Sequence, residues 1–523
     1  MVESLHPWIA LLIPTLPLLA AAWIAVGYLF GWNRGETGER ETAWVALGAI
    51  SLSLLLLLVL DGLALSGNAP GQIIVGDWLT IGSIQIHLSF LFDRLVLVMA
   101  TLVAFISLLV TRFSVNYLHR EAGFQRFFLV LSLFNAAMLL IVTAGSAVFT
   151  FFGWELAGVS SYLLIGYAWH RNTATANATR AFVTNRIGDA GFVLALVFSL
   201  IWLGSVEWSE IPTVVNDKAI PTLEIGLIIG GFLLAALAKS AQLPFSSWVT
   251  RALEGPTPSS TIFYGALMIH AGVYLMLRME PLLTMVPALM IMLLMIGLLT
   301  SLYAWLAGLV QSDIKTSLMF ATLTQVGLML VWIGLGWFDL ALLHLVVHAI
   351  WRSWQFLSSP SYMQQVQQPA KPAPAWLRKH PRLYTAAMQR FWLDDLSDWL
   401  LVKPTRALAH EAQLFDEQVV DRLIGIPSHA NMLSTLSRLE ASKQGLFTVA
   451  NEVGKGRGLF GFIFEWLAEA MQWLEDRLVL PSDGGALMKL VNYLGRHLEK
   501  IDHLLAQPRY LLLIIMATIM VVL

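Results

Sequence analysis

Apolar segments of membrane-spanning length recur along most of the first 357 residues of the chain. A helix needs about 20 predominantly apolar residues to cross the hydrocarbon core of a bilayer. Segments of that length lie at 8–30, 43–65, 91–113, 127–143, 145–168, 181–204, 223–243, 259–278, 282–309, 314–336 and 338–357. They predict an all-α integral membrane protein, consistent with the 57% apolar content. A shorter apolar run at 510–523 predicts a further helix, for about twelve in total.

The density of charged residues rises sharply after about residue 350, which divides the chain into parts. We expect a membrane body at 1–357, a Pro/Gln-rich linker at 358–383, a polar tail at 384–507 and a membrane anchor at 508–523. In the tail, apolar and acidic residues recur at helical spacing, which predicts amphipathic helices. Three placements are open: the inner membrane surface, neighbouring subunits, or the body of the same chain.

The charges of the loops predict an orientation. Basic residues concentrate in every second loop, and cytoplasmic loops carry an excess of such residues. They are Arg34, Arg40, Arg120, Arg126, Arg171, Arg180 and Arg251. We therefore expect the N-terminus outside and residues 358–507 in the cytoplasm, in a multi-pass protein of the cell inner (plasma) membrane. Between the second and third spans, WLTIGSIQIHLSF alternates apolar and polar residues and predicts a short β-hairpin on the outer face.

Several classes of protein are excluded by the composition. With no cysteine, the chain cannot form a disulfide, a thiolate zinc site or an iron–sulfur cluster. A net charge of −2 without a basic stripe argues against nucleic-acid binding. We found no phosphate-binding glycine motif and no nucleophile elbow. The chain alone therefore shows no catalytic centre and no cofactor site, and membrane lipids are its first expected partners.

Two opposite charges interrupt apolar helices near their middle. A charge at the centre of a span costs about 2.5–3.5 kcal/mol, so Glu155 and Lys239 each need a partner or a wet cavity. The simplest arrangement pairs them, either as a static ion pair or as part of a proton or cation relay. Pro244 follows Lys239 closely, which predicts a broken helix with free carbonyls and favours a hydrated cavity at Lys239.

A second set of titratable residues lies on one face of the last multi-pass span. His344, His348 and Arg352 are spaced four residues apart and therefore stack along the helix. A metal site is disfavoured because no third ligand is evident. Imidazoles can donate on one nitrogen and accept on the other, so the stack favours a proton-carrying chain. The alternative is that neighbouring helices simply satisfy both rings.

Further ionisable residues complete the candidate set: Asp189 with Arg186, Asp313 with Lys315, and His270. For Arg186 and Asp313, ordinary helix-end charge is the competing interpretation.

Four blocks then resemble a known family: FFGWELAGVSSYLLIGY, LAKSAQLPFSSWVTRALEGPTPSS, LVQSDIKTSLMFATLTQVGLML and LHLVVHAIWR. They are similar to the largest antiporter-like subunit of respiratory complex I, which is shared with Mrp-type cation/proton antiporters. The resemblance implies two inverted five-helix repeats, each with a broken helix. It also implies that Glu155 and Lys239 form a controlling pair, with Lys315, His344 and His348 on a central hydrophilic axis.

Three departures from that family stand out. Arg352 occupies a position where the family usually has Lys, and Tyr264 one where it has His, with His270 further along the same segment. The second broken helix has no counterpart between Arg352 and the linker, so the second repeat is expected to be truncated. Such shortening resembles the membrane subunit of DAB-type inorganic-carbon accumulation complexes. That resemblance implies a soluble, zinc-containing, carbonic-anhydrase-like partner in the cytoplasm.

Three functions therefore remain in competition. The first is a proton- (or Na⁺-) conducting subunit that drives CO₂ or bicarbonate uptake, which the departures favour. The second is a proton-pumping subunit of a complex I-like NADH:quinone oxidoreductase. The third is a non-conducting membrane scaffold.

Overall fold

The computed structural model describes residues 6–33, 35–81, 84–359 and 372–416, with three single positions beyond them. The chain divides into two compact units, Met1–Thr405 and Arg406–Leu523. The first unit holds the elements described below, except α20, most of which belongs to the second unit. The expected anchor at 508–523 and most of the expected tail lie outside the described residues.

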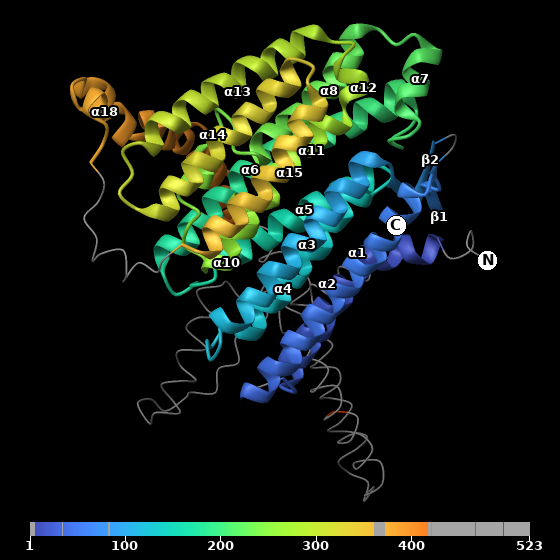
Figure 1. The fold of residues 1–523 in the computed structure, drawn as a ribbon, viewed down its shortest axis with the longest axis horizontal. Coiled ribbons are helices and arrows are strands. Elements are labelled where there is room, and N and C mark those ends of the chain that lie inside the picture. Colours follow the sequence, from blue (N-terminus) through green and yellow to red (C-terminus); the bar gives the residue numbers. More distant parts are fainter. Residues whose placement is uncertain are drawn as a thin grey trace, which may run out of the picture. The chain divides into compact units, whose positions relative to one another are not determined.

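The first half of the chain contains long helices and one hairpin (Figure 1). They are α1 (His6–Phe30), α2 (Gly35–Leu65), β1 (Gly71–Ile81), β2 (Ile84–Phe92), α3 (Arg94–Tyr117), α4 (Phe124–Thr143), α5 (Ala147–Ile165), α6 (Asn172–Phe198), its π-helical continuation η1 (Ser199–Leu203), α7 (Ile211–Lys218) and α8 (Thr222–Lys239).

The second half has more short elements. They are α9 (Ser247–Thr250), α10 (Thr257–Ser260), η2 (Thr261–Ala266), η3 (Met268–His270), α11 (Ala271–Arg278), α12 (Glu280–Leu283), α13 (Pro287–Gly308), α14 (Ile314–Gly334), α15 (Phe338–Leu357), α17 (Ala375–Arg378), α18 (Pro381–Met388), η4 (Arg390–Trp392), α19 (Leu393–Ser397), η5 (Asp398–Val402) and α20 (Lys403–Phe415).

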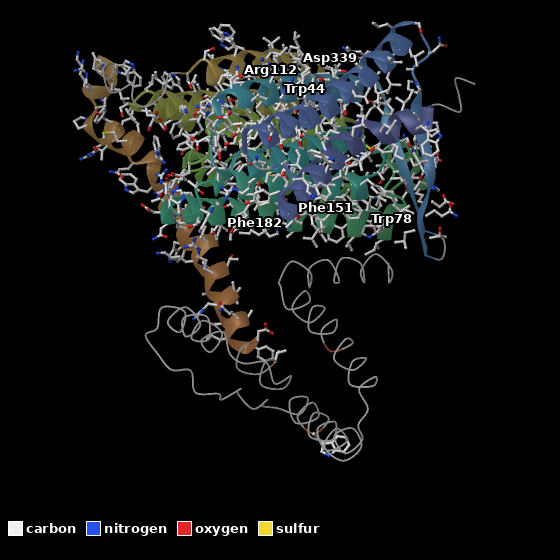
Figure 2. The ribbon with its side chains drawn as sticks, turned by 90° about the horizontal axis from the view of Figure 1, so that it is seen from below. Trp44, Trp78, Arg112, Phe151, Phe182 and Asp339 are labelled. Carbon is white, nitrogen blue, oxygen red and sulfur yellow. The ribbon has the colours of Figure 1, made fainter. Side chains whose placement is uncertain are left out.

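The predicted membrane body is confirmed as helical. Within the described residues, ten helical segments are long and apolar enough to cross a membrane. Helix α15 forms the eleventh predicted span; it has 20 residues but is less apolar, because His344, His348 and Arg352 lie on it. Large apolar side chains face outward from the bundle, among them Trp44, which is 67% exposed (Figure 2). That exposure suits a surface surrounded by lipid.

The predicted hairpin is also confirmed. Strands β1 and β2 pair antiparallel, and Gly71 lies opposite Phe92. Glu207, between η1 and α7, anchors the hairpin: it is buried and accepts hydrogen bonds from Ser89 Oγ at 2.6 Å and the His87 backbone N–H at 3.2 Å. Burial raises the pKa of Glu207, although the hydrogen bond from Ser89 opposes that shift.

Helices α6 and α8 approach each other closely because glycines line their contact. A Cβ on Gly191 would lie 2.8 Å from the Gly231 carbonyl oxygen, and one on Gly188 would lie 2.2 Å from the Ala238 Cβ. Small residues at such contacts let spanning helices pack at backbone distance. This packing brings the middle of α6 against the last turns of α8.

The predicted break near Lys239 is confirmed, with a difference in detail. Helix α8 ends at Lys239, and Ala241 has φ +52°, in the left-handed region. We expected free carbonyls, but the Ala238 carbonyl accepts from Trp248 Nε1 at 2.9 Å and the Leu237 carbonyl from the Gln242 N–H at 2.8 Å. Buried backbone groups need such partners, and the chain beyond the break supplies them.

A further irregularity was not predicted. The span Thr257–Arg278 is one apolar segment in the sequence, but it consists of α10, the π-helix η2, the 3-10 turn η3 and α11. Leu267, between η2 and η3, has φ −116° and ψ −67°. This local change of helix type sets the direction of His270.

Residues Arg390–Val402, which we call the strap, pack on the body of the same chain. Of the three placements considered for the amphipathic tail, this one holds for the strap. Asp394 and Ser397 of the strap are buried, whereas Trp399 is 67% exposed. The structure also begins helical turns at Ala375, inside the range expected to be an extended linker.

Candidate functional site

Four ionisable side chains from three spanning helices form one network, in which Asp189 and Lys239 are buried and Glu155 and Arg186 are partly exposed. Glu155 comes from α5, Arg186 and Asp189 from α6, and Lys239 from the end of α8. Arg186 Nη1 donates to Glu155 Oε2, and its Nη2 lies 3.1 Å from Asp189 Oδ2. Lys239 Nζ lies 3.9 Å from Asp189 Oδ1. We call these four residues the charged network.

The network differs from the pair expected from sequence. Glu155 and Lys239 do not pair with each other: Glu155 pairs with Arg186, and Lys239 pairs with Asp189. Arg186 is therefore part of the intramembrane site and not a helix-end charge. Alternating charges let each ion face an opposite one, which offsets the cost of removing them from water.

Trp154 joins the two ends of the network. Its indole Nε1 donates to Asp189 Oδ1 at 2.7 Å, and its backbone carbonyl accepts from Lys239 Nζ at 3.1 Å. The ammonium also lies 5.0 Å from the centre of the Trp154 ring, within cation–π range. Lys239 is only 1% exposed, so the expected hydrated cavity is replaced by direct contacts with Trp154 and Asp189.

The network retains unused hydrogen-bonding capacity. Glu155 Oε1 and Arg186 Nε are buried and make no hydrogen bond to another atom of the described residues. Buried polar atoms of this kind usually bind water. Waters held at these atoms would extend the network along the membrane.

A second cluster consists of two histidines and an arginine. His270 Nε2 and His348 Nδ1 share a hydrogen bond of 3.0 Å, which joins η3 to α15. Arg352 Nε donates to His348 Nε2 at 3.4 Å. Both nitrogens of the His348 ring are thus engaged, and we call these three residues the histidine relay.

The relay lies next to the charged network along the backbone. Ser240, which follows Lys239, donates through its hydroxyl to the Ile269 carbonyl at 2.6 Å, and Ile269 precedes His270. His344 lies to one side: its Nε2 bonds Gln325 Oε1 at 2.9 Å, and its Nδ1 accepts from Trp332 Nε1 at 3.1 Å. Both nitrogens of the His344 ring are therefore bonded to side chains of α14, and the partner of His348 across the helices is His270.

The remaining candidates have different environments. Lys315 Nζ donates to Thr257 Oγ1 at 2.6 Å, and Thr257 also bonds the Tyr117 hydroxyl at 3.0 Å. Asp313 caps the start of α14 by accepting from the Thr316 N–H at 2.7 Å, so it is a helix-end charge. The Tyr264 hydroxyl donates to the Ala252 carbonyl.

No group of three histidine or carboxylate side chains suited to hold a metal occurs within the part of the chain that the structure describes.

Sequence reasoning missed Trp154, Ser240 and Thr257, because neutral polar residues in apolar spans carry no signal as strong as a charge. Trp154 and Ser240 directly adjoin Glu155 and Lys239 in sequence, and this adjacency could have marked them as candidates.

Comparisons with known proteins agree on one family. A family model described as NADH:quinone oxidoreductase/Mrp antiporter, TM, matches residues 144–393. A second, described as NADH-Ubiquinone oxidoreductase (complex I), chain 5 N-terminus, matches residues 78–128. Together they match more than half of the chain.

Curated relatives match at about one third identity. The chloroplastic NAD(P)H-quinone oxidoreductase subunit 5 of Nephroselmis olivacea is 35% identical over 68% of this chain and 55% of its own length. NADH-quinone oxidoreductase subunit L of Neisseria meningitidis is 34% identical over 66% of this chain and 52% of its own length. The chain thus spans about half the length of these relatives.

A solved structure shows the same fold. A chain in the Mrp complex from Dietzia sp. DQ12-45-1b matches with a TM-score of 0.58 at 19% identity, over 100% of this chain and 63% of that chain.

Proposed function

Because this chain belongs to the antiporter-like membrane subunits of the complex I/Mrp family, we propose that it conducts protons (or Na⁺) across the membrane as one subunit of a larger complex. The observation that carries this proposal is the charged network, which joins three spanning helices and has Asp189 and Lys239 buried at its centre. Ionisable residues at membrane depth are costly and usually mark an ion pathway.

The histidine relay favours protons over Na⁺. A ring that donates on one nitrogen and accepts on the other can pass a proton, and the rings of His348 and His270 share a hydrogen bond. Lys239 can also release a proton when desolvated, whereas Arg186 and Arg352 hold theirs and act as fixed positive charges. Na⁺ would instead need several oxygen ligands.

The relatives named above favour a complex I-like pump over the inorganic-carbon function that the sequence departures favoured. CO₂ or bicarbonate uptake with a carbonic-anhydrase-like partner remains a second candidate. Its support is that, among the described residues, the elements between α15 and the strap are short helices and not a second broken span. In either case we propose partner subunits and an inner-membrane location.

Reconstitution tests the conducting role. We expect the tagged chain, purified with its partners and placed in proteoliposomes, to dissipate an imposed pH gradient at least about tenfold faster than empty vesicles, read with an entrapped pH dye. Flavin and iron–sulfur subunits in the preparation would support the pump, and a zinc-bearing soluble protein the carbon function. If the pH gradient decayed no faster than in empty vesicles, the result would support the non-conducting scaffold.

The orientation has its own test, because the chain has no native cysteine. Lys379→Cys should react with a membrane-impermeant maleimide only after cells are permeabilised, since the residue is exposed and predicted to be cytoplasmic. Asn216→Cys is the matched control. Asn216 is exposed in α7, which lies between two spans on the side predicted to be outside, so the variant should react in intact cells. The reverse pattern would show that the predicted topology is inverted.

A further inference from the structure

The strap is fastened to the body by a buried carboxylate. Asp394 accepts from Thr250 Oγ1 at 3.1 Å, from Arg251 Nε at 3.0 Å and from Arg390 Nη1 at 3.2 Å. Asp394 is 5% exposed, and both of its oxygens are engaged. Oδ2 accepts from both arginines and Oδ1 from the Thr250 hydroxyl, and hydrogen bonds from charged donors are roughly twice as strong as neutral ones.

Two further contacts extend the attachment. Ser397 Oγ and Ser247 Oγ lie 2.6 Å apart, and both residues are buried. Arg180 of α6 makes two hydrogen bonds to the carboxylate of Asp398. The strap thus contacts α6 and the two ends of α9, at residues 140 to 218 positions away in sequence.

The backbone at the start of the strap shows that these contacts hold it in place. Arg390, Phe391 and Trp392 have φ values of 52°, 54° and 54°, three consecutive non-glycine residues in the left-handed region. Such residues occur singly in most proteins, and a run of them persists only where surrounding contacts impose it.

The element under the strap also supports Lys239. Helix α9 has only four residues, and its Trp248 donates to the carbonyl of Ala238, the residue before Lys239. The contacts run from Asp394 and Ser397 to α9, and from α9 to the end of α8.

We propose that Asp394 is a positioning residue: by clamping the strap on α9, it keeps the broken end of α8, and with it Lys239, aligned with the charged network. This inference rests on the proposed conducting function. If Asp394 has this role, the strap directly influences the ion pathway. Release of the strap would loosen α9 and misplace Lys239 without removing any group from the network.

A different role for Asp394 has to be separated from this one. A polar cavity of about 550 Å³ lies beside the strap, lined by Thr250, Arg251, Glu254, Thr316 and Asp394 among others. A carboxylate at the edge of such a cavity could itself carry ions. The two roles differ in whether a neutral link can replace the carboxylate.

The experiment uses a removable link. In the assembled complex, Asp394→Asn should lower ion flux at least tenfold. Adding Ser247→Cys and Ser397→Cys places two thiols at the 2.6 Å hydroxyl contact, within reach of a disulfide. We expect oxidation of the triple variant to restore flux to within about threefold of the oxidised Ser247→Cys/Ser397→Cys protein, and a reductant to abolish it again.

Asp395→Asn is the matched control, because Asp395 is exposed beside the same cavity and makes none of these contacts; its flux should be unchanged. A triple variant with a verified disulfide that stays inactive would overturn the positioning role and indicate an ion-carrying carboxylate. Wild-type flux in Asp394→Asn would overturn it as well. Absence of flux in the wild-type complex would instead be a failure of the proposed function.

Discussion

Lys239→Met is expected to lower ion flux by at least about 100-fold while the protein still inserts and assembles. The substitution removes the cation that faces Asp189 Oδ1 at 3.9 Å and the Trp154 carbonyl at 3.1 Å. A 100-fold loss corresponds to a rise of about 2.7 kcal/mol in the barrier to ion transfer, because each 1.36 kcal/mol changes a rate about tenfold. Asp189 keeps Arg186 nearby, so we expect the fold to survive.

Lys218→Met provides the matched control. Lys218 lies outside the spans, in α7, and donates to the Leu203 carbonyl at 2.6 Å. The same chemical change there should leave flux within about twofold, since one partly exposed hydrogen bond contributes about 1 kcal/mol. Flux is measured in proteoliposomes and normalised to assembled protein. Normal flux in Lys239→Met would exclude the charged network from the ion pathway. Loss of assembled protein would show that the network is needed for folding or assembly.

His348→Gln is expected to reduce flux on the order of 100-fold, as loss of a positioned proton-transfer group commonly does. The ring joins His270 at 3.0 Å to Arg352 at 3.4 Å, and an amide of similar size cannot take up and release a proton as imidazole does. His270→Gln should produce a loss of similar size, because it removes the other half of the same hydrogen bond.

His344→Gln is the internal comparison on the same helix. Its ring bonds Gln325 and Trp332 instead of His348, and the two ring centres are 6.2 Å apart. We expect a loss smaller than about tenfold, from one or two disturbed hydrogen bonds. Equal losses in His344→Gln and His348→Gln would contradict the assignment of the relay, and unchanged flux in both would remove α15 from the pathway.

Much of the fold could be predicted from local sequence. Runs of about 20 apolar residues predicted the spans because only a helix satisfies its own backbone in lipid. Pro244 soon after Lys239 predicted the break in α8, and period-two alternation predicted the hairpin. The break within Thr257–Arg278 escaped prediction because no proline or polar run marks Leu267.

The sequence by itself identified Glu155 and Lys239 as charges within apolar spans, because the cost of burying a charge is a property of each residue and its span. Which groups meet was decided by tertiary structure. Gly188 and Gly191 allow α6 to approach α8, and this close packing places Lys239 beside Asp189. Glu155 pairs with Arg186 instead. The π-helix η2 and the turn η3 direct His270 to His348. Pairing depends on distances between helices, and those are set by packing along whole helix faces, which no single segment of sequence contains.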